Sequence, residues 1–194
     1  SGALWTRISG TNTAISRYGF GPGAGGYAGI PQGYAGYSGA WHGGRGSSYW
    51  LLSNTQKVIY GDAAHPVTAG SGGDMPIGYG GEIAGSRGWS GGGVVRIEAS
   101  GSVVVNGSVL ADGGGGNNSG GSRDTYGSGG SIWITCKAIS GSGTVSAAGG
   151  SGGDPRYPVG YWRQLTNNYL DIKNGFPGGG GRIAIDYDPE AQAT

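Results

Sequence analysis

Ionisable side chains, cysteine and long apolar runs are scarce in this chain, and each scarcity excludes a class of protein. Charged residues make up 12% of the 194 positions, and the formal net charge is +1. The lysines, Lys57, Lys137 and Lys173, lie far apart, so no basic run points to nucleic acid. The one cysteine, Cys136, rules out a disulfide framework. No apolar run is long enough to span a membrane.

Recognisable leader and nucleotide-binding segments are also missing from the sequence. Residues 1–5 have neither the charged region nor the apolar region of a signal peptide, so we expect a mature or excised piece. The glycine-rich stretches at 19–23 and 91–93 are followed by neither a P-loop lysine nor a helical pattern. We therefore exclude nucleotide binding at these loops.

Glycine is what the chain has in excess. It supplies 49 residues, against about 7% in an average protein, yet there is no strict Gly-X-Y period and hence no collagen helix. Disordered chains combine low hydrophobicity with high net charge, whereas this chain is nearly neutral and 10% aromatic. The length suits one folded domain, 1–194. Interior glycine costs a helix about 1 kcal/mol relative to alanine, so we expect no substantial helix.

A repeat organises the second half of the chain. Residues 94–114 and 131–150 each contain an alternating strand, a second short β segment, a turn of small residues, a third segment and then Ala-X-Gly-Gly. A partial third copy covers 182–187. A glycine block precedes each copy, at 91–93, 127–130 and 178–181. Three β segments per unit with Gly, Asn, Ser and Asp corners predict an all-β, glycine-rich parallel β-helix (β-solenoid) with irregular glycine-rich loops.

Side-chain alternation predicts which residues face inward. Val95 and Ile97, and likewise Ile132 and Ile134, fall on one face, and Cys136 continues that face as a buried thiol. Glu98 is out of phase and should face solvent, as a solvated rather than a catalytic carboxylate. The other inward positions predicted are Val103, Val105, Val109, Ile139 and Val145. The domain then divides into a less regular Gly/Tyr-rich part, 1–90, a repeat-bearing part, 91–187, and a tail, 188–194. Packed polyglycine II helices remain an alternative for residues 19–46.

The glycine blocks with the strands that follow them also carry a resemblance to a known family. Residues 127–134 read Gly-Ser-Gly-Gly-Ser-Ile-Trp-Ile, and residues 178–185 read Gly-Gly-Gly-Gly-Arg-Ile-Ala-Ile. Together with the order of similar blocks over 34–187, they resemble glycine-rich β-helix-like repeat domains of bacterial secreted and cell-surface proteins. The resemblance implies an extracellular or cell-surface location and a place within a larger protein. It assigns no catalytic residue.

Aromatic composition points to a binding function. Six Trp and twelve Tyr accompany only two Phe, and Tyr and Trp present flat amphipathic rings on which sugars stack. The alternative is that these rings cover glycine backbone that has no side chains of its own. We predict an adhesive or carbohydrate-binding module for a polysaccharide or cell-surface glycan. The predicted ligand-binding residues are Trp41, His42, Trp50, Tyr157, Tyr161, Trp162, Arg163 and Tyr169.

Two other functions remain open at this level. Exposed strand edges at the ends of a solenoid suit a structural subunit that self-associates into an extracellular fibre or sheath. A polysaccharide lyase or glycosidase would need a set of acid–base residues. The best such set is Arg45, Asp62, His65 and Asp74. No organic cofactor is expected, and the two Gly-Gly-Asp sequences make Asp74 and Asp154 the candidates for a bound Ca²⁺.

Overall fold

The structure is a computed structural model that describes residues 21–24, 39–47, 58–73, 77–78, 81–82, 88–116, 124–152, 162–164, 170–172 and 175–192. The first copy of the repeat forms β3 (Val94–Glu98), β4 (Ser102–Val104) and β5 (Ser108–Leu110). The second copy forms β6 (Ser131–Thr135), β7 (Ala138–Ser140) and β8 (Thr144–Ser146), and the third forms β11 (Arg182–Asp186). The remaining elements are β1 (Ile77–Gly78), β2 (Gly81–Glu82), β9 (Trp162–Gln164), β10 (Leu170–Ile172) and α1 (Pro189–Gln192).

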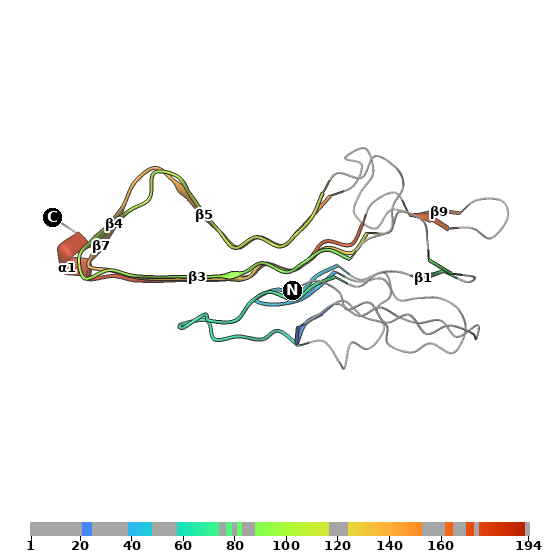
Figure 1. The fold of residues 1–194 in the computed structure, drawn as a ribbon, viewed down its shortest axis with the longest axis horizontal. Helices are drawn as coiled ribbons and strands as arrows, with labels where there is room; N and C mark the ends of the chain where they lie inside the picture. Colours follow the sequence, from blue (N-terminus) through green and yellow to red (C-terminus); the bar gives the residue numbers. More distant parts are fainter. Residues whose placement is uncertain are drawn as a thin grey trace.

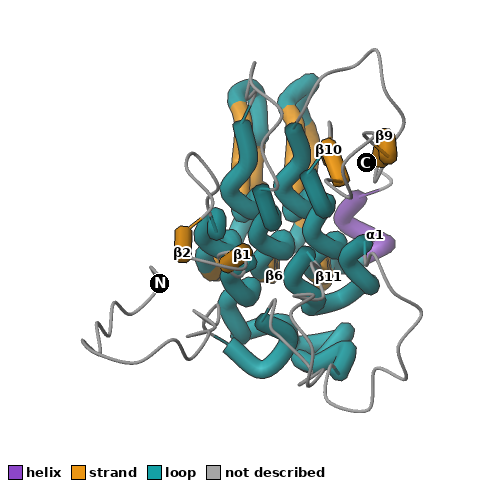
Figure 2. Tube along the Cα trace, turned by 90° about the vertical axis from the view of Figure 1, so that its right-hand side faces the viewer, coloured by secondary structure: helices purple, strands orange, loops and turns teal. Residues whose placement is uncertain are grey.

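The three copies of the repeat lie side by side in parallel (Figure 1, Figure 2). β3, β6 and β11 form one three-stranded sheet with β6 in the centre, in which Val95, Ile132 and Ile183 are register partners. Two further parallel pairs, β4–β7 and β5–β8, join the remaining segments of the first two copies. Like residues therefore sit over like residues, and the alternating valines and isoleucines of each copy share one face.

The β-helix predicted from the repeat is wrong. In the described part of the chain the parallel sheets are short, with two or three strands each, and they close into neither a solenoid nor a barrel. One reason is that the third copy does not repeat its second and third segments after Asp186. Another is that the glycine blocks between the copies form hydrogen bonds in several directions, whereas a solenoid side is a continuous ladder.

The chain after β11 replaces a third strand beside β7. Asp188 accepts hydrogen bonds from the N–H groups of Glu190 and Ala191, which makes it the N-cap of α1. This single turn brings the Gln192 side chain to Ile139. The Ile139 N–H donates to Gln192 Oε1 at 2.8 Å, and Gln192 Nε2 donates to the Ile139 carbonyl at 3.0 Å. A side-chain amide thus occupies the place of the next strand. No described helix is long and apolar enough to cross a membrane.

The glycine blocks upstream of the strands pack in a pattern with a period of three residues. Parallel bridges join Gly88 to Thr125 and Thr125 to Phe176, so the copies are already aligned there. Donors three residues apart then contact the same neighbouring segment. The pairs are Trp89–Thr125 and Gly92–Ser128, Tyr126–Phe176 and Gly129–Gly179, and Gly178–Gly150 and Gly181–Ala147. Three residues per turn is the period of a polyproline II-type helix. This pattern lies in 89–92, 126–129 and 178–181, whereas the sequence suggested such helices at 19–46, of which only 21–24 and 39–46 are described.

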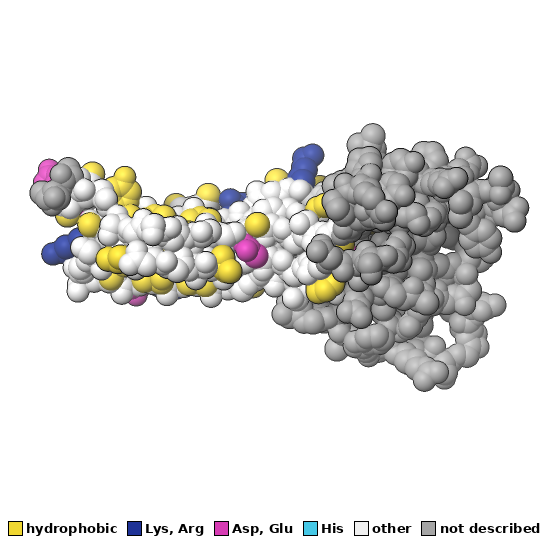
Figure 3. Space-filling model, turned by 90° about the horizontal axis from the view of Figure 1, so that it is seen from above, with side chains coloured by type: hydrophobic (Ala, Val, Ile, Leu, Met, Phe, Trp, Pro, Cys, Tyr) yellow, Lys and Arg dark blue, Asp and Glu magenta, His cyan; other side chains and the backbone are white. Residues whose placement is uncertain are grey.

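The apolar core lies between the three-stranded sheet and the two strand pairs. Its buried members are Ala111, Ile132, Ile134, Cys136 and Ala147. Six of the predicted inward positions pack against them: Val95, Ile97, Val103, Val109, Ile139 and Val145. Val105, also predicted to face inward, does not belong to this cluster. Cys136 is 7% exposed, which confirms the buried thiol, and Glu98 is exposed as predicted. Seen from above, the described surface carries scattered hydrophobic side chains and few charges (Figure 3).

Candidate functional site

Three insertions leave the stacked copies at one place. They lie between residues 73 and 88, 116 and 124, and 152 and 175. Parallel bridges join Gly88 to Thr125 and Thr125 to Phe176, so the chain segments that follow the three insertions lie side by side. The Gly73 N–H, where the first insertion begins, donates to the Trp89 carbonyl at 2.8 Å. β1 and β9, which belong to the first and third insertions, lie at the end of the molecule opposite α1 (Figure 1). The bases of the three insertions therefore lie together.

The bases of the insertions form a tightly packed surface, which we name the insertion platform: Gly73, Trp89, Asp124, Tyr126, Gly152 and Phe176. Glycine is required where an insertion begins. A Cβ atom at Gly73 would lie 2.2 Å from the Thr125 carbonyl oxygen, and one at Gly152 would lie 1.9 Å from the Gly116 oxygen. Asp124, Tyr126 and Phe176 are buried beneath.

Polar groups of the insertion platform are structural rather than reactive. The Trp89 indole N–H donates to Asp124 Oδ2 at 3.3 Å, and the Trp89 and Tyr126 ring centroids lie 6.4 Å apart. Burial, with a further contribution from the Asp124 charge, raises the pKa of Tyr126 to about 12. Its hydroxyl is buried and has no hydrogen-bond partner among the described residues. A phenol with so high a pKa stays neutral and serves as packing at physiological pH.

Two hairpins are described within the insertions. β1 pairs with β2, and β9 pairs antiparallel with β10, with Trp162 opposite Ile172 and Arg163 opposite Asp171. Trp162 and Arg163 are the two predicted ligand-binding residues on β9. The other predicted ligand residues in or near the insertions, Trp50, Tyr157, Tyr161 and Tyr169, lie outside the described residues, as do the calcium candidates Asp74 and Asp154.

Trp41 and His42, also predicted to bind ligand, are buried. Trp41 is 5% exposed, and the Arg45 guanidinium carbon lies 5.4 Å from its ring centroid. His42 is fully buried, with Nδ1 2.8 Å from the Gly129 carbonyl oxygen and Nε2 2.9 Å from Thr68 Oγ1. Because a carbonyl oxygen only accepts, Nδ1 carries the proton and Nε2 accepts from the Thr68 hydroxyl. Neither ring offers a solvent-exposed face for a sugar.

His42 supplies a hydrogen bond that backbone groups supply in the neighbouring copies. The register makes the carbonyls of residues 92, 129 and 180 equivalent. The His42 imidazole donates to the carbonyl of the central residue, Gly129, whereas backbone N–H groups donate to the carbonyls of Gly92 and Gly180 on either side. The flanking bonds run from Gly70 to Gly92 and from Gly44 to Gly180, each at 2.9 Å. The side chain is thus part of the structure that supports the sheet.

Burial of His42 predicts sensitivity to acid. Desolvation lowers the pKa of His42 below its ordinary value of 6.5, with Arg182 lowering it further, and its backbone hydrogen bonds oppose the shift. The unfolded chain then binds the proton more readily. The free energy of unfolding should therefore fall as pH drops below about 6.5, by at most about 1.4 kcal/mol per pH unit for one group. Thermal unfolding measured from about pH 7.5 to about pH 5 checks this.

The matched variant for this pH profile is His42→Gln. Glutamine keeps an N–H donor for the Gly129 carbonyl but does not titrate. Its melting temperature should be lower than that of the parent at pH 7 and should depend less on pH. Parallel pH profiles for parent and variant would assign the acid sensitivity to another group.

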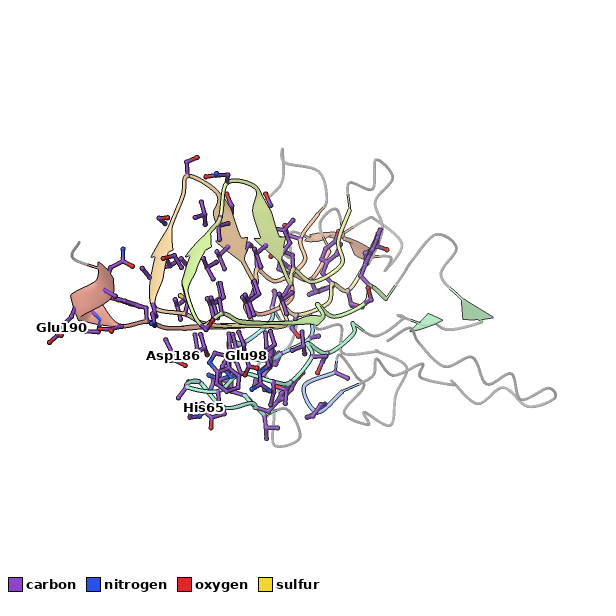
Figure 4. All side chains as sticks on the ribbon, turned by 60° about the vertical axis from the view of Figure 1, so that its left-hand side comes forward. His65, Glu98, Asp186 and Glu190 are labelled. Carbon is purple, nitrogen blue, oxygen red and sulfur yellow. The ribbon has the colours of Figure 1, made fainter. Side chains whose placement is uncertain are left out.

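A second cluster, which we name the Trp133 cluster, comprises His65, Arg96, Trp133 and Asp186 on the outer face of the three-stranded sheet. The Trp133 indole N–H donates to Asp186 Oδ2 at 2.7 Å, and the Arg96 guanidinium carbon lies 4.6 Å from the ring centroid. The His65 ring meets it edge-on at 5.1 Å, and Arg96 also pairs with Glu98. Figure 4 shows Glu98 and Asp186 on the side of the sheet where His65 lies. The cluster fastens the segment 58–73 to the sheet.

The catalytic set considered from the sequence does not assemble among the described residues. Asp62 Oδ1 accepts the N–H groups of His65 and Ala64, and these bonds lower the pKa of Asp62. A general acid needs the opposite shift. Arg45 contacts the ring of Trp41 instead, and Asp74 lies outside the described residues. The described part of the chain also holds no group of three or more His, Cys, Asp or Glu able to bind a metal ion.

Comparisons with protein-family models, with curated proteins and with solved structures found no match to this chain. The family resemblance and the extracellular location therefore stay predictions. Sequence reasoning missed the insertion platform, because Trp89, Asp124 and Tyr126 are brought together by contacts between different copies. The only local signal was the glycine flanking each insertion.

Proposed function

We propose that this chain is an extracellular carbohydrate-binding module that uses the end carrying its insertions as the contact surface. The observation that carries the proposal is that the bases of three insertions meet at the insertion platform. Loops held at their bases by a rigid framework are where proteins most often place binding residues. Here the bases are fixed by backbone hydrogen bonds and by buried aromatic rings.

The composition of the third insertion supports a glycan as the ligand. The sequence between residues 152 and 175 carries Tyr157, Tyr161, Trp162 and Tyr169, together with Arg163 and several amide side chains. Aromatic rings stack on the apolar faces of sugars, and nearby polar groups hydrogen-bond the hydroxyls. The net charge of +1 favours an uncharged polysaccharide over a polyanion.

Structural roles of the described carboxylates favour binding over cleavage. Asp112 Oδ1 accepts from the Ser146 hydroxyl at 2.5 Å and from the Ala148 N–H at 2.7 Å, which joins the segment after β5 to the end of β8 and the residues that follow it. Asp186 accepts from the Trp133 indole, and Asp188 caps α1. Each of these carboxylates stabilises local structure, and we therefore place binding ahead of hydrolysis or elimination.

Replacing Trp162 by alanine should weaken polysaccharide binding. Loss of one stacking ring at a binding surface typically costs about 1–3 kcal/mol, so we expect an affinity reduced by about tenfold or more. Affinity electrophoresis in gels containing a panel of soluble polysaccharides measures the change. Reducing-end and unsaturated-product assays on the same mixtures report any cleavage.

Trp133→Ala is the matched control, because it removes the same ring from the Trp133 cluster on the outer face of the sheet. It should migrate as the parent does once circular dichroism has shown that it is folded. Equal retardation of parent and Trp162→Ala would remove β9 from the contact surface. Product formation by the parent would replace a binding module with a lyase or glycosidase.

A further inference from the structure

Among the described residues, no further strand pairs with either edge of the three-stranded sheet. In β11, the Arg182 N–H and the Asp186 carbonyl are bonded toward β6, so the backbone groups of Ile183 and Ile185 point away from the sheet. On the β3 side, the Gly93 carbonyl accepts from the Ser131 N–H, and the Ala99 N–H donates to the Thr135 carbonyl. Backbone groups of every second residue from 93 to 99 therefore bond to β6, and those of Val94, Arg96 and Glu98 point away from the sheet. Each edge presents donors and acceptors in the phase that a parallel strand requires.

The core-facing side chains of β11 are incompletely covered. Ile132 and Ile134 of the central strand are fully buried, because β3 and β11 flank them on both sides. Their register partners in β11, Ile183 and Ile185, are 43% and 36% exposed. One more parallel strand beside β11 would give these two isoleucines the surroundings of Ile132 and Ile134.

Equivalent glycines at the start of the three strands differ in what a side chain there would contact. A Cβ atom at Gly181 would lie 2.0 Å from the Gly130 carbonyl oxygen, and one at Gly130 would lie 1.9 Å from the Gly93 oxygen. Close contact with the preceding copy therefore requires glycine at both positions. Gly93 is the equivalent residue of the first copy, and a Cβ atom there would meet nothing within 4 Å.

At the β11 edge, the residue one position earlier in each copy shows the same kind of difference. Cβ atoms at Gly92 and Gly129 would lie 1.9 Å and 2.0 Å from the Ala111 and Ala147 carbonyl oxygens, and 2.5 Å and 2.6 Å from the backbone nitrogens of Gly130 and Gly181 in the following copy. Gly180 is their equivalent in the third copy, and a Cβ atom there meets nothing within 4 Å. Gly93 is therefore a glycine at a position where only a neighbouring layer of the same kind would exclude a side chain. Gly180 is open both because no layer follows it and because the third copy lacks the segment that holds Ala111 and Ala147 in the other copies.

We propose that a second copy of this chain stacks head to tail on the first, with the β11 edge of one molecule against the β3 edge of the next. In the register used inside the molecule, Ile183 lies beside Val95 of the neighbour and Ile185 beside Ile97. The backbone of Gly93 in one molecule then approaches residues 180 and 181 of the neighbouring molecule. Within one molecule, Gly130 approaches residues 92 and 93 in the same way. Because the two edges differ, the contact is heterologous and produces linear arrays.

Charge on the outer face sets the strength of this contact. In the same register Asp186 comes beside Glu98 of the neighbour, whereas Thr135 separates these carboxylates within one molecule. This like-charge contact opposes stacking, and Arg96, which pairs with Glu98, partly offsets it. We therefore expect a weak association that strengthens when Glu98 is replaced by glutamine.

Sedimentation velocity on the full chain, from about 10 µM to about 1 mM, tests the proposal. The parent should show sedimentation coefficients that rise with concentration. Gly93→Ala leaves the monomer without a clash, because nothing lies within 4 Å, but places a methyl group in the stacking contact. We expect it to weaken association by about tenfold or more. Ile183→Lys, which puts a charge on the β11 edge, should act in the same direction.

Gly107→Ala is the matched control. It also introduces a methyl group where nothing lies within 4 Å, but in the turn between β4 and β5, and the third copy of a neighbouring molecule has no corresponding turn to meet it. It should associate as the parent does, and Glu98→Gln should associate more strongly. A parent that stays monomeric up to about 1 mM, or a folded Gly93→Ala variant with unchanged association, would overturn the proposal. Binding of polysaccharide by a strictly monomeric parent would overturn stacking while leaving the proposed function intact.

Discussion

Replacing Gly181 by alanine is expected to destabilise the protein by about 3 kcal/mol or more, whereas the same replacement one residue earlier, at Gly180, is expected to be neutral or slightly stabilising. The methyl group at 181 would lie 2.0 Å from the Gly130 carbonyl oxygen, and the close atoms are all backbone atoms of Gly129 and Gly130, which cannot rotate away as a side chain can. At 180 nothing lies within 4 Å, and the backbone is not in the left-handed region. Urea unfolding followed by circular dichroism, at a concentration low enough to keep the chain monomeric, gives both free energies of unfolding.

The same tetraglycine run supplies an internal control for this contrast. Gly179→Ala places a methyl group 2.1 Å from the Gly44 carbonyl oxygen and should resemble Gly181→Ala, although the contact is with a different segment. Equal stability of the variants at 179, 180 and 181 would mean that the glycine blocks do not pack as closely as described. The contrast therefore tests the three-residue packing pattern as well as the individual positions.

Tyr126 should respond in opposite directions to two substitutions. Tyr126→Phe removes a buried hydroxyl that has no hydrogen-bond partner among the described residues, so we expect stability to rise by about 1 kcal/mol. Tyr126→Ala removes a fully buried ring at the base of the insertions, and we expect a loss of about 3–5 kcal/mol. Chemical denaturation of the three proteins in parallel measures both differences.

Tyr126→Phe also tests the role of the insertion platform. If the ring is packing only, polysaccharide affinity should be unchanged in this variant. A loss of affinity with no loss of stability would mean that the hydroxyl contacts ligand. A loss of stability in Tyr126→Phe would show that the hydroxyl has a bonding partner after all.

Much of the repeat-bearing part could be read from residue alternation. The valines and isoleucines that recur at every second position form β3, β6 and β11 and face the core, and Cys136 follows them inward. Alternation of apolar and other residues involves only neighbouring positions, so the strands and their inward faces can be predicted from the sequence alone. Closure of the predicted solenoid depended on a third copy with three segments, and after Asp186 the chain instead forms α1 and uses Gln192 as a substitute strand.

The candidate site was less accessible from the sequence. Trp41 and His42 were predicted as exposed binding residues, yet both are buried, since glycine-rich segments leave space that aromatic and imidazole rings fill. Residue type alone does not distinguish a ring that covers backbone from a ring that meets a ligand. The insertion platform was also invisible, because its residues meet only after the copies are aligned through Gly88, Thr125 and Phe176.

The three-residue hydrogen-bond period has a mechanical consequence. Successive N–H groups from Tyr126 to Gly129 donate to different segments, at Phe176, Gly114, Ser71 and Gly179, rather than to one neighbouring strand. Pulling on any one segment therefore loads bonds to several others at once, whereas a hairpin opens one bond at a time. A module held together in this way should resist shear from several directions and deform little before it yields.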